Sequence, residues 1–165
     1  MIDKLKLTEY LKEYGIEQRA QVIDELDKFS ELLTERNKVV NLTAIKEPEE
    51  IAVKHLLDSL LIFKYADFPE GAAVIDVGCG AGFPSLPMLI ARKDLKLTFL
   101  DSTGKKLNFI DDVMSELSLS GQTLHARAEE QSRKNVSRET QAPPMHPPPS
   151  CQPSYPYADA VRSVR

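Results

Sequence analysis

The stretch VIDVGCGAGFP, from Val74 to Pro84, decides the fold. Its first four residues are mostly apolar, with Asp76 as the one polar exception, and predict a short buried strand. Glycines follow at every second position: Gly78, Gly80 and Gly82. An apolar run over 86–91 comes next. This order predicts a strand, a tight turn and a helix, because glycine accepts positive φ and lets a ligand approach the backbone.

The turn also predicts the kind of ligand. Pro84 fits the first turn of the following helix, where its missing N–H costs nothing. We expect the turn to leave backbone N–H groups unpaired at the start of that helix. Such groups favour an anionic or strongly polar ligand group.

A second acidic residue, Asp101, closes the next expected strand, over 95–101. One βαβ unit separates it from Asp76, and at that distance a carboxylate can accept the ribose hydroxyls of a bound adenosine. The spacing G-x-G-x-G differs from the G-x-G-x-x-G that is typical of dinucleotide-binding turns. The pattern therefore predicts a nucleotide-like cofactor at the two strand ends. A helix N-cap or a plain strand end is the alternative role for Asp101.

Length and charge limit the remaining possibilities. The 165 residues suffice for one domain, or for one domain with an appendage. The net charge of −4 gives no general attraction to nucleic acid, so an RNA contact needs a local basic patch. The two cysteines predict neither a disulfide framework nor a metal site. We expect a cytoplasmic protein, because no signal peptide and no apolar run of about 20 residues stand out.

Three helices are expected before the glycine turn, over 3–14, 17–39 and 48–64, and they form an N-terminal helical segment, 1–66. In the second helix, four apolar residues recur at spacings of four, three and four and define a buried face: Val22, Leu26, Phe29 and Leu33. Its charged residues, Asp27 among them, are expected on the solvated face.

His55 and Asp58 share a face of the third helix, because they stand three residues apart. They either line a site or form an ordinary polar pair at the surface. Two such residues without a third ligand do not make a metal site.

The rest of the chain divides into a partial cofactor-binding domain, 67–140, and a proline-rich tail, 141–165. In the domain, Ser102 is expected to cap a helix, and 122–126 to form a third strand. Lys105 and Lys106 fall in the first turn of that helix, where cations oppose the dipole, which hints at an anionic partner. The tail is expected to be disordered, because its density of proline forbids helix and interior strand. It reads either as a polyproline linker or recognition segment or as an out-of-frame remainder.

Residues 1–140 closely resemble the RsmG (GidB) family, bacterial methyltransferases that modify guanine N7 in 16S ribosomal RNA with S-adenosylmethionine. The resemblance rests on several stretches in order: Asn41–Ile45, Lys54–Leu60, Asp76–Pro84, Leu100–Ser102, Lys105, Lys106, Phe109 and Arg127–Glu129. It implies an α/β fold, a Rossmann-like class I S-adenosylmethionine-dependent methyltransferase core, here incomplete and preceded by a helical segment.

The resemblance also implies a cofactor site. Gly78 and Phe83 would border the methionine and adenosine portions of S-adenosylmethionine. Further residues would bind the ribose and enclose the adenine: Asp101, Ser102, Thr103, Ala128 and Glu129. Four residues are candidate RNA contacts: His55, Lys105, Lys106 and Arg127. No catalytic residue is assigned, because guanine N7 carries a free lone pair and needs no general base.

The implied partner is 16S ribosomal RNA or the small ribosomal subunit, with no membrane, and the chain is expected to act as a monomer. Family members continue into more strands, so we expect a truncated or frame-shifted chain whose strand 74–77 is an exposed apolar edge. Two alternatives stay open. One is a non-catalytic remnant of such an enzyme, and the other is a nicotinamide-dinucleotide-binding module.

Overall fold

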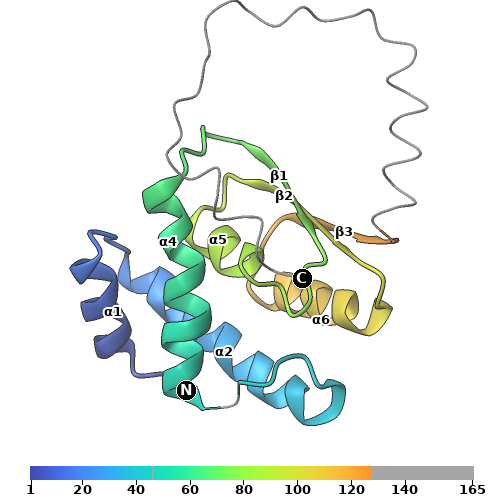
Figure 1. The fold of residues 1–165 in the computed structure, drawn as a ribbon, viewed down its shortest axis with the longest axis horizontal. Helices are drawn as coiled ribbons and strands as arrows, with labels where there is room; N and C mark the ends of the chain where they lie inside the picture. Colours follow the sequence, from blue (N-terminus) through green and yellow to red (C-terminus); the bar gives the residue numbers. More distant parts are fainter. Residues whose placement is uncertain (46, 128–165) are drawn as a thin grey trace, which may run out of the picture.

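The computed structural model describes residues 1–45 and 47–127 (Figure 1). Within them the chain forms helices and strands in this order: α1 (Lys4–Glu13), α2 (Ala20–Val40), α3 (Pro48–Glu50), the π-helix η1 (Ile51–Leu57), α4 (Asp58–Tyr65), β1 (Ala73–Val77), α5 (Ser85–Ala91), β2 (Lys96–Asp101), α6 (Gly104–Glu116) and β3 (Gly121–His125). The proline-rich tail, 141–165, and the end of the expected cofactor domain, 128–140, lie outside the described residues.

The three strands form one parallel sheet in the order β1-β2-β3. Val77 pairs with Leu100, and Leu100 pairs with Leu124, so the carboxyl ends of all three strands meet at one edge. Figure 1 shows the labelled helices together on one side of the sheet, with α2 and α4 on the outer side of α5 and α6. The Rossmann-like α/β architecture predicted from the sequence is confirmed, and β3 begins one residue before the expected position.

Helix α2 connects the two parts of the core. The apolar residues of its predicted face are all buried, namely Val22, Leu26, Phe29 and Leu33. The Phe29 ring lies 6.3 Å from the Phe109 ring of α6 and 5.3 Å from the Phe83 ring of the glycine turn. The helical segment and the sheet therefore share one apolar core.

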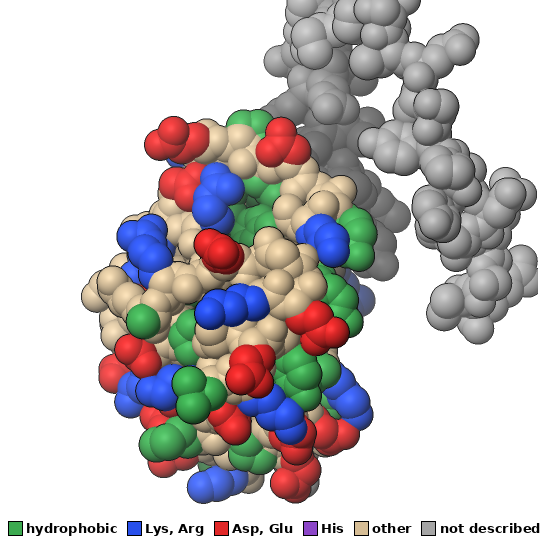
Figure 2. Space-filling view, turned by 90° about the vertical axis from the view of Figure 1, so that its left-hand side faces the viewer, with side chains coloured by type: hydrophobic (Ala, Val, Ile, Leu, Met, Phe, Trp, Pro, Cys, Tyr) green, Lys and Arg blue, Asp and Glu red, His purple; other side chains and the backbone are tan. Residues whose placement is uncertain are grey.

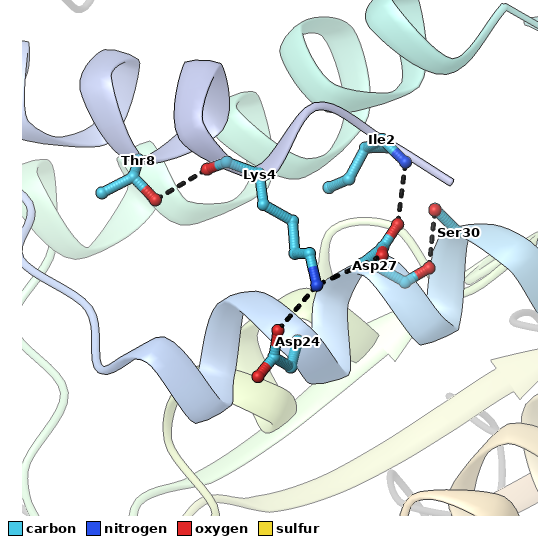
Figure 3. Close-up of polar contacts among 6 residues, drawn as sticks. All are labelled: Ile2, Lys4, Thr8, Asp24, Asp27 and Ser30. Carbon is cyan, nitrogen blue, oxygen red and sulfur yellow. Dashed lines mark hydrogen bonds and ion pairs between the residues drawn. The ribbon is translucent and has the colours of Figure 1, made fainter.

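Polar contacts tie α1 to α2 (Figure 3). The backbone N–H of Ile2 donates to Oδ1 of Asp27 at 2.7 Å, and Nζ of Lys4 lies 3.9 Å from Oδ2 of Asp27. Lys4 also donates to Asp24 at 2.9 Å. The prediction of a solvated position for Asp27 is wrong, because these two partners allow its carboxylate to be buried against the N-terminus.

The third predicted helix has the expected extent but is not uniform. Residues 48–65 form one helical run in which seven central residues adopt the π-helix η1. Ile51, Leu56 and Leu57 of η1 are buried, so the wider turn still delivers its apolar residues to the core. A hydrophobic period in the sequence does not reveal such a local change of winding. In other proteins, π-helical turns are frequently found at functional sites.

Strand β1 is not the buried strand that its apolar composition predicted. Its side chains alternate between two faces. Val74 packs on the core, and Asp76 shares its face, whereas Ile75 and Val77 remain 56% and 57% exposed on the other face. Among the described residues β1 is an edge strand, which agrees with the alternative expectation of an exposed apolar edge.

No helix in the described part of the chain is long and apolar enough to cross a membrane.

Candidate functional site

A hollow of about 450 Å³ opens at the carboxyl ends of the three strands. We call it the strand-end hollow, and it is lined by Val77, Gly78, Leu100, Asp101, Ser102, Ala126 and Arg127. In open α/β sheets this edge is where ligands bind. The structure thus brings four of the predicted site residues together at one place: Gly78, Asp101, Ser102 and Arg127.

Asp101 is the most firmly held residue of this hollow. Its side chain accepts hydrogen bonds from the backbone N–H of Gly80 at 3.0 Å and of Thr103 at 2.8 Å. Nζ of Lys106 lies 3.8 Å from Oδ2 of Asp101. Burial by itself would raise the pKa of Asp101, but these hydrogen bonds and the Lys106 charge outweigh it, and the pKa lies below its usual value. An ionised carboxylate therefore stands at a fixed place in the wall.

The glycine turn uses several of its own N–H groups, whereas the sequence predicted unpaired N–H groups at the start of the following helix. Gly78 and Cys79 both donate to the Leu100 carbonyl, at 2.7 and 3.1 Å, and Gly82 donates to the Cys79 carbonyl at 2.7 Å. With the Gly80 N–H directed at Asp101, the turn keeps four of its donors for the protein. Asp101 is the acidic side chain in the described wall of the hollow, so next to it the arrangement favours a cationic or hydroxyl-bearing ligand group over an anionic one.

Gly78 and Gly82 of the turn each require glycine, for different physical reasons. Both adopt the left-handed backbone, with φ of +80° at Gly78 and +90° at Gly82. A Cβ at Gly82 would lie 2.4 Å from Cδ1 of Leu86, whereas one at Gly78 would meet nothing within 4 Å. Gly82 therefore allows α5 to pack on the turn, and Gly78 leaves open backbone toward the hollow.

Asp76 carries an unused acceptor. Its Oδ2 atom is buried and has no hydrogen-bond partner within the described residues. Burial raises the pKa of Asp76, the Ser85 hydroxyl opposes this change, and the charge of Asp101 adds to it. A buried carboxylate oxygen without a partner is costly and calls for a donor. A ligand bound beside the turn would supply one.

The start of α6 differs from the prediction in its cap. Thr103, not Ser102, is the N-cap residue, because the Asp101 side chain takes the Thr103 N–H and the helix begins at Gly104. Lys106 leans toward Asp101, which offsets its position at the positive end of the helix dipole. Lys105 is exposed in the same turn.

Phe83 and His55 lie together on another side of the turn. Their rings stack at 4.2 Å with an angle of 13° between the planes, and neither lines the strand-end hollow. His55 Nε2 lies 2.9 Å from Oγ1 of Thr43. Burial lowers the pKa of His55, and the nearby charge of Asp58 opposes this. No hydrogen bond joins His55 to Asp58 in the part of the chain that the structure describes.

Sequence reasoning did not single out the residues that hold His55. Asn37 is buried in α2, and its side chain accepts from the N–H of Leu42 at 2.6 Å and of Thr43 at 3.0 Å and donates to the Thr43 carbonyl at 2.9 Å. This brace fixes Thr43, which in turn fixes the histidine. The only sequence signal was an asparagine four residues after Leu33, on the apolar face of a helix.

The site suits a ligand that combines a positive charge with amino and hydroxyl donors. The partnerless oxygen of Asp76 and the ionised carboxylate of Asp101 match these donors and this charge. The open backbone at Gly78 leaves room beside them. Ala128 and Glu129, expected to enclose the adenine, lie outside the described residues.

Surface charge is mixed on the side of the molecule where α1 lies. Figure 2 shows acidic and basic side chains interspersed over this face. This face therefore offers no broad basic patch for RNA. Among the expected basic contacts, Arg127 lines the hollow and Lys106 lies 3.8 Å from its Asp101, whereas Lys105 is exposed in the first turn of α6.

Comparison with known proteins gives a consistent result. The family model described as rRNA small subunit methyltransferase G (GidB) matches residues 22–140. The ribosomal RNA small subunit methyltransferase G of Clostridium perfringens (strain SM101 / Type A) is 47% identical over 112 residues, which are 67% of this chain and 47% of that protein. The protein of the same name from Lachnoclostridium phytofermentans is 39% identical over 140 residues, or 84% of this chain and 58% of that one. The chain spans about half the length of these relatives.

Proposed function

The chain belongs to the rRNA small subunit methyltransferase G family, and from this premise we propose that it transfers a methyl group from S-adenosylmethionine to guanine N7 of small-subunit (16S) ribosomal RNA. The observation that carries the proposal is the ionised carboxylate of Asp101 next to the open backbone of Gly78 in the wall of the strand-end hollow. Asp76, on the neighbouring strand and outside that wall, adds a buried oxygen without a partner among the described residues. The name of the relatives supports ribosomal RNA as the substrate.

Different residues would bind different parts of the cofactor. When bound, S-adenosylmethionine supplies a methyl group activated by its sulfonium. Asp101 would accept the ribose hydroxyls with the lone pairs that the Gly80 and Thr103 N–H groups leave free. Asp76 would accept from a positively charged donor. The remaining members of the proposed set are Gly78, Gly80, Gly82, Ser102, Thr103, Ala128 and Glu129, while Phe83 contributes through the turn that it ends.

The acceptor explains why the site needs no proton-transfer residue. Guanine N7 presents a lone pair in the major groove of a duplex and carries no proton. Catalysis is then mainly alignment of donor and acceptor in a dry pocket. Arg127 in the wall of the hollow is a proposed phosphate contact, as are Lys105 and Lys106 in the first turn of α6, because cations next to the site position the RNA backbone.

A nicotinamide dinucleotide fits the turn less well. Such cofactors place a pyrophosphate against free N–H groups at the start of a helix. Here the N–H groups of Gly78, Cys79 and Gly82 are bonded to carbonyls of the protein. Retention on immobilised NAD, together with no retention on immobilised S-adenosylhomocysteine, would favour that alternative.

Transfer of labelled methyl from S-adenosylmethionine to 16S ribosomal RNA tests the reaction. We expect incorporation into RNA made with guanosine and none into the same RNA made with 7-deazaguanosine, which lacks N7. Equal incorporation into both RNAs would contradict the assignment of N7. No incorporation into either, from a folded sample, would favour a non-catalytic remnant.

Calorimetric titration with S-adenosylhomocysteine tests the cofactor site. We expect Asp101→Asn to weaken binding at least about tenfold, because one charged acceptor is lost. Asp67→Asn is the matched control, since this exposed carboxylate lies in the turn after α4, away from the strand-end hollow. Equal affinity in all three proteins would count against the ribose contact.

A further inference from the structure

A second hollow, which we call the α4 hollow, lies beside the glycine turn on the side where His55 stacks on Phe83. Its volume is about 470 Å³, within the range of small-molecule and nucleotide sites. His55 and Phe83 form an aromatic wall, and Tyr65 of α4, 77% exposed, stands at the rim. Aromatic walls of this kind in RNA-binding proteins stack on unpaired bases.

The histidine wall is held in place before any ligand arrives. The Ile45 N–H donates to Oγ1 of Thr43 at 3.2 Å, so the Thr43 hydroxyl proton is free to point at Nε2 of His55. Asn37 braces Thr43 from α2. A ring fixed from behind loses little freedom when a base stacks on it, which favours binding.

The polar groups of the α4 hollow distinguish among bases. Asp58 is exposed, and its carboxylate has no hydrogen-bond or ion-pair partner among the described residues. Lys54 also lines this hollow, and its Nζ donates to Oε1 of Glu50 at 2.5 Å. From this position the Lys54 ammonium can also contact a phosphate of the RNA. A carboxylate accepts two adjacent donors, and guanine alone among the four bases offers that pair, N1–H and N2–H, on its Watson–Crick edge.

We propose that the α4 hollow binds a guanine base of the RNA, stacked on the His55–Phe83 wall, with its Watson–Crick edge donating to Asp58. The inference rests on the proposed function for the identity of the polymer. Binding through that edge leaves N7, on the Hoogsteen edge of the base, outside the contact with Asp58. The α4 hollow and the strand-end hollow then flank one glycine turn, so a single element would position both reactants.

Binding of short single-stranded RNA to the whole chain, followed by fluorescence anisotropy, tests the proposal. One probe has a single guanine among uracils, and the second has adenine at that position. We expect the guanine probe to bind about tenfold tighter. We expect Asp58→Asn to abolish this preference and Asp67→Asn, a matched exposed carboxylate outside both hollows, to keep it. Binding of S-adenosylhomocysteine should be the same in all three proteins.

The two proposals can fail separately. A wild-type protein that binds S-adenosylhomocysteine but prefers neither probe would overturn the α4 hollow as a guanine site and leave the proposed function standing. A guanine preference that survives Asp58→Asn would overturn it as well. A preference lost only in Asp58→Asn would support the guanine site even if S-adenosylhomocysteine does not bind, in which case the proposed function would fail.

Discussion

Strands β1 and β2 begin from similar sequences and end in different environments. Both are apolar and carry an aspartate near the carboxyl end. In β2, Phe99 is buried and Asp101 has two N–H partners. In β1, Ile75 is exposed and Asp76 has an oxygen without a partner in the described residues. Asp101 is therefore fixed by the fold before a ligand arrives, whereas Asp76 still needs a donor from a ligand.

The largest contrast should appear between two apolar residues on the two strands. Phe99→Ala should cost about 3–5 kcal/mol of unfolding free energy, because it leaves a cavity at a fully buried position. Ile75→Ala should cost less than about 1 kcal/mol, because that side chain is 56% exposed. Urea unfolding followed by circular dichroism measures both. Similar losses would mean that β1 is covered in solution.

Asp101→Asn should destabilise the protein at pH 7 by about 1–3 kcal/mol, because an amide replaces an acceptor for two N–H groups with one acceptor and one clashing donor. The folded pKa of Asp101 is below its ordinary value of 3.8. Its stabilisation is therefore complete above that value and is lost as the pH falls through the lowered pKa. Measured from pH 7 down through this pKa, the difference in unfolding free energy between the wild type and Asp101→Asn should become smaller in acid. A gap independent of pH would contradict the role of the charge.

Asp76→Asn should raise the free energy of unfolding at pH 7, whereas Asp101→Asn lowers it. The folded pKa of Asp76 is raised above 3.8, so the wild type loses stability as the pH rises through that pKa. Asp76→Asn cannot ionise at this position, so it does not lose this stability and should be more stable than the wild type at pH 7 by about 1 kcal/mol. It should also bind S-adenosylhomocysteine more weakly, which calorimetry measures. A gain of stability without loss of affinity would show that Asp76 makes no contact with the ligand.

The smallest effect concerns the glycines that flank the two strands. Gly104 begins α6 after β2 with an ordinary φ, and an added Cβ would meet only the His125 ring, at 3.7 Å. Gly104→Ala should stabilise by about 0.4–1 kcal/mol by restricting the unfolded chain. Gly71, before β1, has equal space but φ of +70°, so Gly71→Ala should destabilise. Thermal unfolding compares them, and equal signs would contradict the backbone argument.

The sequence predicted what depends on period and local chemistry. The buried face of α2, the strand–turn–helix order and the juxtaposition of Gly78 with Asp101 all follow from spacing. It did not predict what depends on partners distant in the chain. Asp27 is buried because Ile2 reaches it, and the turn's N–H groups are used because the Leu100 carbonyl lies across from them.

Contacts between residues distant in the chain also explain why the sequence did not place His55 and Phe83 together. His55 and Phe83 stand 28 positions apart in the sequence and yet stack, and no periodicity connects them. The packing of α4 and of α2 against α5 brings the helical segment to the glycine turn. The spacing that located the strand-end hollow therefore could not locate the α4 hollow.

The π-helix η1 makes chain length itself a requirement of the molecule. Each residue of a helix turns the chain by roughly a quarter turn, so removing one residue between His55 and Asp58 would swing the two side chains apart by about that angle. Substitutions in this stretch exchange one side chain for another, but a deletion would turn Asp58 away from the His55–Phe83 wall. Homologous chains that keep this arrangement should therefore conserve the number of residues between His55 and Asp58.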